Sequence, residues 1–267
     1  MKLPFRNIVL LIVAVFLYIA GLAQRPNLKF KNLSTTQGLS INNATCILQD
    51  KNGFIWIGTR DGLNKYDGYK FTVYRSDPED SSSISANFIW SMKEDLEGNI
   101  WIGTVAGGLN KYLPKSDEFI RYRHNPNDPG SISHNTIQSI LEDGDGNIWA
   151  GSANGLDLLD KKNNKFTHYL HNPKDKNSLA DDNIYKLFED SNGNLWIGTR
   201  SGGLDVFNRK ENIFRHYQFN AADKHSISEN SILTIFEDRE HNIWIGTDSK
   251  GLNLFNSATN KFIRFYS

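Results

Sequence analysis

The chain has 267 residues, a length that fits two average domains or one all-β domain. Its 30 basic and 30 acidic residues balance, so no basic face is indicated and nucleic acid is not an expected partner. Cys46 is the only cysteine, which excludes an intramolecular disulfide and a cysteine-rich zinc site.

Residues 1–23 have the three-part layout of a secretory signal. A basic start, MKLPFR, precedes an unbroken apolar run from Ile8 to Ala20, and Gly21 and Ala23 have the small side chains of a cleavage site. The run is shorter than the roughly 20 residues that a membrane helix needs. We therefore expect cleavage before Gln24, with an uncleaved inner-membrane anchor as the alternative. Either form places the rest of the chain in the periplasm.

Residues 24–40 are a lead-in, and from residue 41 one pattern occurs five times. Gly98 to Thr104 read GNIWIGT, and four near-copies place a tryptophan at the same position. These residues are Trp56, Trp101, Trp149, Trp196 and Trp244, at spacings of 45, 48, 47 and 48 residues. Periods of about 40–50 residues are typical of solenoids, propellers and arrays. The expected repeat bounds are about 41–84, 85–132, 133–179, 180–227 and 228–267.

Each repeat predicts four short antiparallel strands. In the second repeat they are Phe88–Asp95, Asn99–Thr104, a strand that starts at the Gly108–Leu109 pair, and one that contains Phe119 and Tyr122. The turn sequences DLEGN, DGDGN and DSNGN supply the Asp, Asn and Gly that tight hairpins need. No window keeps apolar residues at helical spacing. The pattern predicts an all-β fold of β-propeller blades, with the tryptophan filling the wedge between neighbouring blades.

The repeats resemble a known family. QDKNGFIWIGTRDGLNKYDGYKF and its four relatives look like the two-component regulator propeller repeat. An export signal followed by LKFKNLSTTQGLSINN resembles the N-terminal end of hybrid two-component sensors that detect glycans. The resemblance implies a full sensor with two seven-bladed propellers, an immunoglobulin-like module, a membrane helix, a histidine kinase, a receiver and a DNA-binding domain. No kinase motif occurs in this chain, so we expect no enzyme activity from it.

Five repeats are fewer than the seven blades of the family's ring. Phe30–Leu33 match the fourth-strand pattern of a ring-closing strand, yet the fifth repeat has a fourth strand of its own, FIRFY. We therefore expect the chain to be the front part of a longer sensor, with the remaining blades or the kinase portion as partners. An open array exposes an unpaired blade face, so we also expect self-association.

No cofactor or metal is expected. DGDGN and DSNGN resemble the start of a calcium loop, which needs Glu at its twelfth position. Counting from Asp143 and Asp190 gives Asn154 and Ser201, so these sequences are interpreted as turns. The seven histidines form no HxxxH pair, and no GxSxG motif occurs. The acidic pairs that end the first strands repeat in the chain and are interpreted as scaffold.

Positions that differ between repeats are the candidates for a binding site. After each IGT-like triplet stand Arg60, Val105, Ala153, Arg200 and Asp248, and one first-strand position holds Thr45, Trp90, Gln138, Tyr185 and Leu233. Arginine and aromatic side chains hold sugars and anionic groups by forked hydrogen bonds and stacking. We predict Arg60, Trp90, Tyr185 and Arg200 as ligand-binding residues. The alternative is that the arginines are solvated and the aromatic rings pack between blades.

Three functions fit these observations. The first is a periplasmic sensory or ligand-binding module of a two-component system that responds to an oligosaccharide. The second is an exported protein–protein interaction scaffold, since fold alone does not decide function. The third is a glycan hydrolase or lyase, which needs convergent carboxylates. The order of preference is sensor, scaffold, enzyme.

Overall fold

The computed structural model describes residues 30–266. The predicted secretory signal and most of the lead-in lie outside the described residues. Phe30–Leu33, which match the fourth-strand pattern, belong to a first unit and carry no strand. The unit that begins at Ser34 contains all the strands and is described by itself below. Within residues 30–266 no helix is long and apolar enough to span a membrane.

The second unit consists of five four-stranded antiparallel sheets, which confirms the predicted propeller blades. A short 3-10 turn, η1 (Thr35–Gln37), precedes them. Blade 1 contains β1 (Ala44–Gln49), β2 (Ile55–Thr59), β3 (Gly62–Tyr66) and β4 (Phe71–Tyr74). Blade 2 contains β5 (Ile89–Glu94), β6 (Ile100–Thr104), β7 (Leu109–Leu113) and β8 (Glu118–Tyr122). Blade 3 contains β9 (Ile137–Glu142), β10 (Ile148–Ser152), β11 (Gly155–Asp160) and β12 (Lys165–Tyr169). Blade 4 contains β13 (Ile184–Glu189), β14 (Leu195–Thr199), β15 (Leu204–Asn208) and β16 (Ile213–Tyr217). Blade 5 contains β17 (Ile232–Glu237), β18 (Ile243–Thr247), β19 (Leu252–Asn256) and β20 (Lys261–Phe265).

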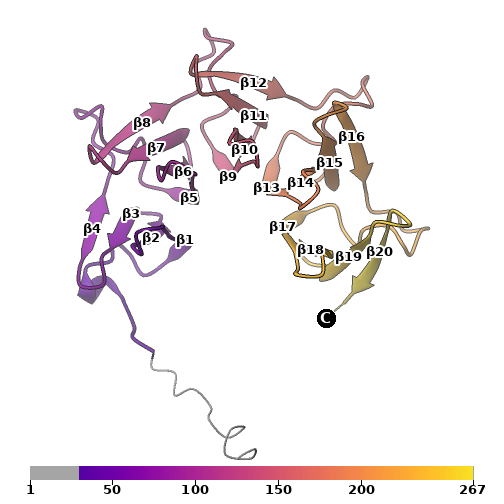
Figure 1. Ribbon diagram of the computed structural model, residues 1–267, viewed down its shortest axis with the longest axis horizontal. Helices are drawn as coiled ribbons and strands as arrows, with labels where there is room; N and C mark the ends of the chain where they lie inside the picture. Colours follow the sequence, from indigo (N-terminus) through magenta and orange to yellow (C-terminus); the bar gives the residue numbers. More distant parts are fainter. Residues whose placement is uncertain (1–29, 267) are drawn as a thin grey trace, which may run out of the picture. The chain divides into compact units, whose positions relative to one another are not determined.

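The blades stand side by side with their first strands on the inner side of the row and their fourth strands on the outer side (Figure 1). Each first strand contacts the first strand of the next blade, from β1 and β5 through to β13 and β17. Strands within a blade follow chain order, so each pair is joined by a short hairpin. This arrangement brings residues of the first strands together although they are far apart in sequence.

The repeated tryptophan and the acidic residue six positions before it form one hydrogen-bonded unit in every blade. The indole Nε1 donates to the aspartate Oδ2 over 2.7 or 2.8 Å in all five blades. The same carboxylate accepts backbone N–H groups of the turn that joins the first two strands. In blade 5, the hydrogen bonds from Trp244 and Asn242 lower the pKa of Asp238 to about 2. The aspartate therefore fixes both the turn and the ring.

Neighbouring blades are joined by packing and by a second set of carboxylates. Trp149 of blade 3 packs with Leu187 and Phe207 of blade 4, and the equivalent contacts recur at the other interfaces. In blades 2–5 the glutamate that ends the first strand accepts a turn N–H of the preceding blade. These bonds run from Lys51 to Glu94, Leu96 to Glu142, Gly144 to Glu189 and Ser191 to Glu237, over 2.7–2.9 Å. The acidic pairs therefore act as scaffold, one member within a blade and the other between blades.

Candidate functional site

A pocket of about 530 Å³ lies on the inner side of the blades and is called the inner pocket below. It is lined by Trp90, Tyr185, Arg200, Ser231, Leu233 and Asp248. These residues come from blades 2, 4 and 5, so the pocket exists only when the blades are assembled. The structure thus brings three of the four predicted ligand-binding residues, Trp90, Tyr185 and Arg200, into one site.

A β-bulge explains why one position of each first strand faces this space. The pairing of first and second strands shifts register between Ile89 and Ser91, which leaves Trp90 as the extra residue. The same shift isolates Tyr185 in blade 4 and Leu233 in blade 5. A bulge leaves its extra residue out of the ladder and re-aims its side chain. As a result, Trp90 is 43% exposed, whereas regular positions beside it pack between blades.

The bulge residues of the first and third blades do not line the pocket. Thr45 of blade 1 donates its hydroxyl to the Ile89 carbonyl at 2.6 Å. Gln138 of blade 3 is buried and donates through Nε2 to Asn183 Oδ1 at 3.0 Å. Both side chains therefore form contacts between blades.

The two loops that carry the charged residues of the pocket are each held by a carboxylate. Asp181 accepts the backbone N–H of Ser201 at 2.8 Å and its hydroxyl at 2.6 Å, beside Arg200. Burial alone would raise the pKa of Asp181, but these hydrogen bonds hold it below its usual value.

In blade 5, Glu229 accepts the N–H of Ser249 at 2.8 Å and its hydroxyl at 3.0 Å, beside Asp248. Asp181 and Glu229 occupy the same position of their repeats, where the first three blades have uncharged or histidine side chains. Hydrogen bonds to acidic residues thus hold in place the two loops that carry Arg200 and Asp248, the charged residues of the inner pocket.

Arg60, the fourth predicted residue, lies next to the pocket rather than in its lining. Its guanidinium carbon is 5.1 Å from the centre of the Phe88 ring, a cation–π contact. The Phe88 ring in turn lies 5.5 Å from the ring of Trp90. Arg60 is exposed, so it is positioned to influence the blade 2 side of the pocket through Phe88.

The lining combines an exposed aromatic ring, an apolar side chain and two opposite charges. Trp90 and Leu233 are 43% and 45% exposed, and Arg200 and Asp248 are exposed as well. Arginine supplies a planar set of donors and aspartate supplies acceptors, while the ring offers a stacking surface. Such a pocket suits a ligand that has both polar groups and an apolar face.

Sequence reasoning missed Ser231, Leu233 and Asp248 as lining residues. Leu233 and Asp248 occupy the same two variable positions as Tyr185 and Arg200, so the variation that pointed to the predicted residues also contained them. The prediction did not include them because it considered only arginine and aromatic side chains at these positions. Ser231 carried no such signal, because its contribution depends on the path of the loop before β17.

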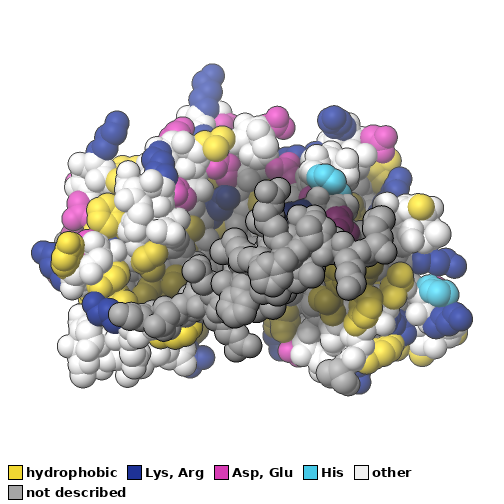
Figure 2. Space-filling view, turned by 60° about the horizontal axis from the view of Figure 1, so that its bottom comes forward, with side chains coloured by type: hydrophobic (Ala, Val, Ile, Leu, Met, Phe, Trp, Pro, Cys, Tyr) yellow, Lys and Arg dark blue, Asp and Glu magenta, His cyan; other side chains and the backbone are white. Residues whose placement is uncertain are grey.

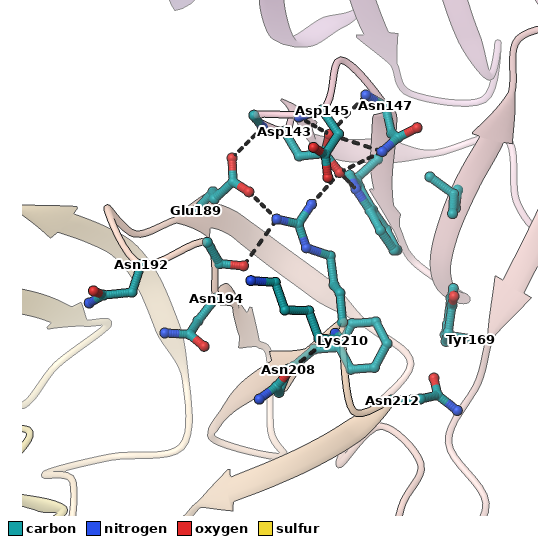
Figure 3. A pocket seen from close by; sticks show the side chains of 16 residues that line it. Asp143, Asp145, Asn147, Tyr169, Glu189, Asn192, Asn194, Asn208, Lys210 and Asn212 are labelled. Carbon is teal, nitrogen blue, oxygen red and sulfur yellow. Dashed lines mark hydrogen bonds and ion pairs between the residues drawn. The ribbon is translucent and has the colours of Figure 1, made fainter.

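A larger pocket, of about 790 Å³, opens at the turns between blades 3 and 4. Asp143 and Glu189 lie at the same end of the lining (Figure 3), and the Arg209 guanidinium forms ion pairs with both. Asp143 also holds the indole of Trp149, and Glu189 binds the turn of blade 3. These groups already have structural partners, so this space is better explained as an interface between blades than as a ligand site. Among residues 30–266 no cluster of His, Cys, Asp or Glu has the arrangement of a metal site.

Comparison with known proteins gives matches of different weight. A family model described as "Two component regulator propeller" matches residues 38–61, 83–106, 131–154, 178–201 and 226–249. The extracellular domain of the putative hybrid two-component system BT3049 from B. thetaiotaomicron is 34% identical, with a TM-score of 0.76 over 88% of this chain. "Histidine kinase P4" from Formosa agariphila is 53% identical over 70 residues, which is 26% of this chain.

A further protein, of unknown function and from Bacteroides thetaiotaomicron, is 11% identical with a TM-score of 0.51, and this likeness concerns the fold alone. The chain covers 32% of the solved extracellular domain and 5% of the curated kinase. It therefore spans less than half the length of each of these two proteins.

Proposed function

Because the chain is built from repeats of the two-component regulator propeller family, we propose that it is an exported, ligand-sensing part of a hybrid two-component system. We further propose that the inner pocket binds an oligosaccharide. The similar proteins support the first step, since one is an extracellular domain of such a system and another is a histidine kinase. The remaining propeller blades, the membrane segment and the kinase would belong to other parts of the complete sensor.

One observation carries the ligand proposal. The repeats keep their scaffold residues, but at the bulge and at the following loop they differ, and five of these ten differing residues line one pocket. A position that only maintains the blade has no reason to change from Trp90 to Tyr185 to Leu233. Variation at exposed, convergent positions is the pattern expected when a repeat scaffold is adapted to a ligand.

The chemistry of the lining favours a sugar. The exposed Trp90 ring offers a flat apolar surface for the C–H face of a pyranose. Asp248 accepts hydrogen bonds from hydroxyl groups, and Arg200 donates to ring and hydroxyl oxygens. A hydrolase function has less support. Glycoside hydrolysis normally uses two carboxylates, and Asp248 is the one carboxylate that lines the pocket. We therefore propose binding without catalysis.

A screen of the purified protein against an array of oligosaccharides, followed by calorimetry on the best ligand, tests this proposal. Trp90→Ala and Arg200→Ala should each weaken binding by about tenfold, which corresponds to about 1.4 kcal/mol, without lowering the melting temperature. Tyr69→Ala is the matched control, because Tyr69 is an aromatic residue 95% exposed in a turn of blade 1. The proposal is wrong if no oligosaccharide binds, or if binding survives both pocket substitutions unchanged.

The scaffold alternative is favoured by a separate feature, the apolar side chains exposed on the two end blades. If no oligosaccharide binds, the scaffold alternative becomes the better explanation of the function.

A further inference from the structure

The blade 4 half of the inner pocket depends on one stretch of chain between β12 and β13, residues 176–183, which is called the connecting segment below. Tyr185 is the second residue after it. Within it, Asp181 holds the loop that carries Arg200, and the Asn183 carbonyl accepts the backbone N–H of Arg200 at 2.9 Å. Two of the six lining residues therefore take their positions from the connecting segment.

The connecting segment also lies directly against the loop of Arg200. A Cβ placed on Gly202 in that loop would lie 2.6 Å from the Asp181 Cβ and 2.8 Å from the carbonyl carbon of Ala180. No side chain fits at these distances, so glycine permits the close approach of the two stretches of chain. A displacement of the connecting segment is therefore passed on to the loop.

A single histidine holds the connecting segment at two points. His216 Nδ1 lies 2.7 Å from Asp205 Oδ1, and the other oxygen of that carboxylate accepts the Ala180 N–H at 2.8 Å. His216 Nε2 lies 2.9 Å from the carbonyl oxygen of Lys176. The first contact holds the segment through Asp205, and the second holds it directly.

The protonation state of His216 decides whether both contacts can exist. A protonated imidazole donates from both ring nitrogens, whereas a neutral ring has one N–H and can donate to only one of the two acceptors. The hydrogen bond to Asp205 raises the pKa of His216 above its ordinary value of about 6.5. Both contacts are therefore complete below that value, and one is lost as pH rises through the raised pKa.

The charges around this pair act in the same direction. Burial raises the pKa of Asp205, and the nearby Asp181 carboxylate adds to this effect. A neutral His216 leaves these two carboxylates to repel one another, which loosens the connecting segment further. The other charged residues of the connecting segment and of β16 are Lys176, Asp182 and Arg215.

The blade 5 half of the inner pocket is held by groups whose charge does not change near neutral pH. There Arg264 Nε donates to the Ser226 carbonyl at 2.7 Å, and Asn253 Oδ1 accepts the N–H of Ser228 at 2.9 Å. Most basic side chains visible in Figure 2 are likewise lysine and arginine, and few are histidine. Of the two blades that supply charges to the pocket, blade 4 therefore has the histidine-dependent support.

Blade 3 has the same kind of pair without a pocket residue. His168 lies 2.5 Å from Asp157 and 2.9 Å from the carbonyl oxygen of Pro129. The stretch that this pair holds leads to Gln138, which is buried and does not line the inner pocket. The blade 3 pair is therefore an internal control for the blade 4 pair.

We propose that protonation of the His216–Asp205 pair regulates the inner pocket, ordering its Tyr185 and Arg200 side while the pair holds its proton. A rise in pH loosens this side and leaves the blade 5 side in place. The consequence for ligand affinity rests on the function proposed above, whereas the consequence for the pocket itself does not.

Hydrogen exchange of the ligand-free protein tests the proposal without a ligand. Amide exchange, corrected for the intrinsic effect of pH, is followed at Ala180 and Ser201 in blade 4 and at Ser228 and Ser249 in blade 5. The blade 4 amides should lose protection as pH rises above about 6.5, and the blade 5 amides should keep theirs. Equal changes in both blades, or no change in either, overturn the proposal.

Two double variants identify the group that titrates. Asp205→Asn with His216→Arg introduces the residues of blade 5 and should keep the blade 4 amides protected as pH rises. Asp157→Asn with His168→Arg makes the same change in blade 3 and should leave the loss of protection in blade 4 unaltered. If the loss persists in the first variant, another group causes it and the proposal is wrong.

Calorimetry with the oligosaccharide selected by the array separates this proposal from the function itself. Its affinity should fall by about fivefold as pH rises for the unaltered chain and the blade 3 variant, and should stay constant for the blade 4 variant. If no oligosaccharide binds, the proposed function fails, and hydrogen exchange still decides whether the pair controls the pocket. If an oligosaccharide binds with the same pH dependence in all three proteins, the regulation is refuted and the binding function stands.

Discussion

Two edges of the blades carry different kinds of sequence. At the turn edge, where the first strand meets the second, all five blades repeat an aspartate that binds its tryptophan. At the pocket edge, the bulge position holds a different residue in each of the five blades. The first position of the loop after the second strand holds four residue types among the five blades. Repetition therefore marks the residues that maintain a blade, and variation marks where blades are free to acquire separate roles.

Variation alone is not sufficient to identify a site, however. The residue after the first leucine of the third strand is Asn64, Asn110 and Asn253 in three blades but Asp157 and Asp205 in the other two, and all five are buried. Where the residue is Asp, the fourth strand supplies a histidine: His168 Nδ1 lies 2.5 Å from Asp157, and His216 Nδ1 lies 2.7 Å from Asp205. Compensated variation in the interior is thus structural, and only exposed, convergent variation indicates binding.

The largest expected effect lies at the turn edge. Asp143→Ala should lower the free energy of unfolding by about 3 kcal/mol, because it leaves the Trp149 indole, the Asn147 side chain and the Arg209 guanidinium without their shared acceptor. Urea denaturation followed by tryptophan fluorescence measures the change. Asp145→Ala in the same turn is the control and should have little effect. Equal losses for both variants would contradict the distinction between repeated and incidental residues.

The buried Asp–His pairs should give the next largest effect. His216→Ala leaves the carboxylate of Asp205 buried with the Ala180 N–H as its remaining donor and should cost about 2 kcal/mol in denaturation experiments near pH 6. Asp205→Asn combined with His216→Arg copies the residues of blade 5 and should recover most of that loss. His225→Ala, at an exposed histidine, serves as the control. If the double variant is no more stable than His216→Ala, the two positions do not compensate one another.

The same pairs predict a pH dependence. In His168, Nδ1 lies 2.5 Å from Asp157 and Nε2 lies 2.9 Å from the Pro129 carbonyl, an arrangement that favours the protonated ring. The hydrogen bond to the aspartate raises the pKa of His168 above its ordinary value of about 6.5, and Asp205 does the same for His216. Their stabilisation is complete below that ordinary value and is lost as pH rises through the raised one.

Stability measured by thermal denaturation should therefore fall as pH rises above the ordinary histidine value of about 6.5. Replacing both pairs by Asn and Arg should flatten this slope. An unchanged slope would show that other groups control the stability in this range.

The smallest stability effect is expected at the pocket edge. Trp90→Ala and Arg200→Ala should change the free energy of unfolding by about 0.5 kcal/mol or less, because both side chains are exposed. Chemical denaturation measures this directly. A loss comparable to that of Asp143→Ala would mean that Trp90 belongs to the scaffold and would remove the main argument for the inner pocket.

Much of the fold was accessible from the sequence because its determinants are local. The hairpin turns are specified by neighbouring Asp, Asn and Gly residues, and the aspartate and its tryptophan stand six positions apart in one hairpin. Phe30–Leu33 match a fourth strand in pattern but carry no strand, because a strand forms only where a partner strand completes its hydrogen bonds. The glutamate contacts between blades could not be predicted from the sequence either, because they join residues about one repeat apart.

The sequence by itself therefore determined the blade, its five copies, and the positions at which those copies differ. Only the tertiary structure decided which of the differing residues meet. Trp90 and Asp248 are distant in the chain, yet stacking of the first strands and the bulges within them place both on one pocket. The structure also decided that Arg60 contacts the site through Phe88 and that Gln138 is buried. These outcomes depend on side-chain directions and blade packing, which no local pattern encodes.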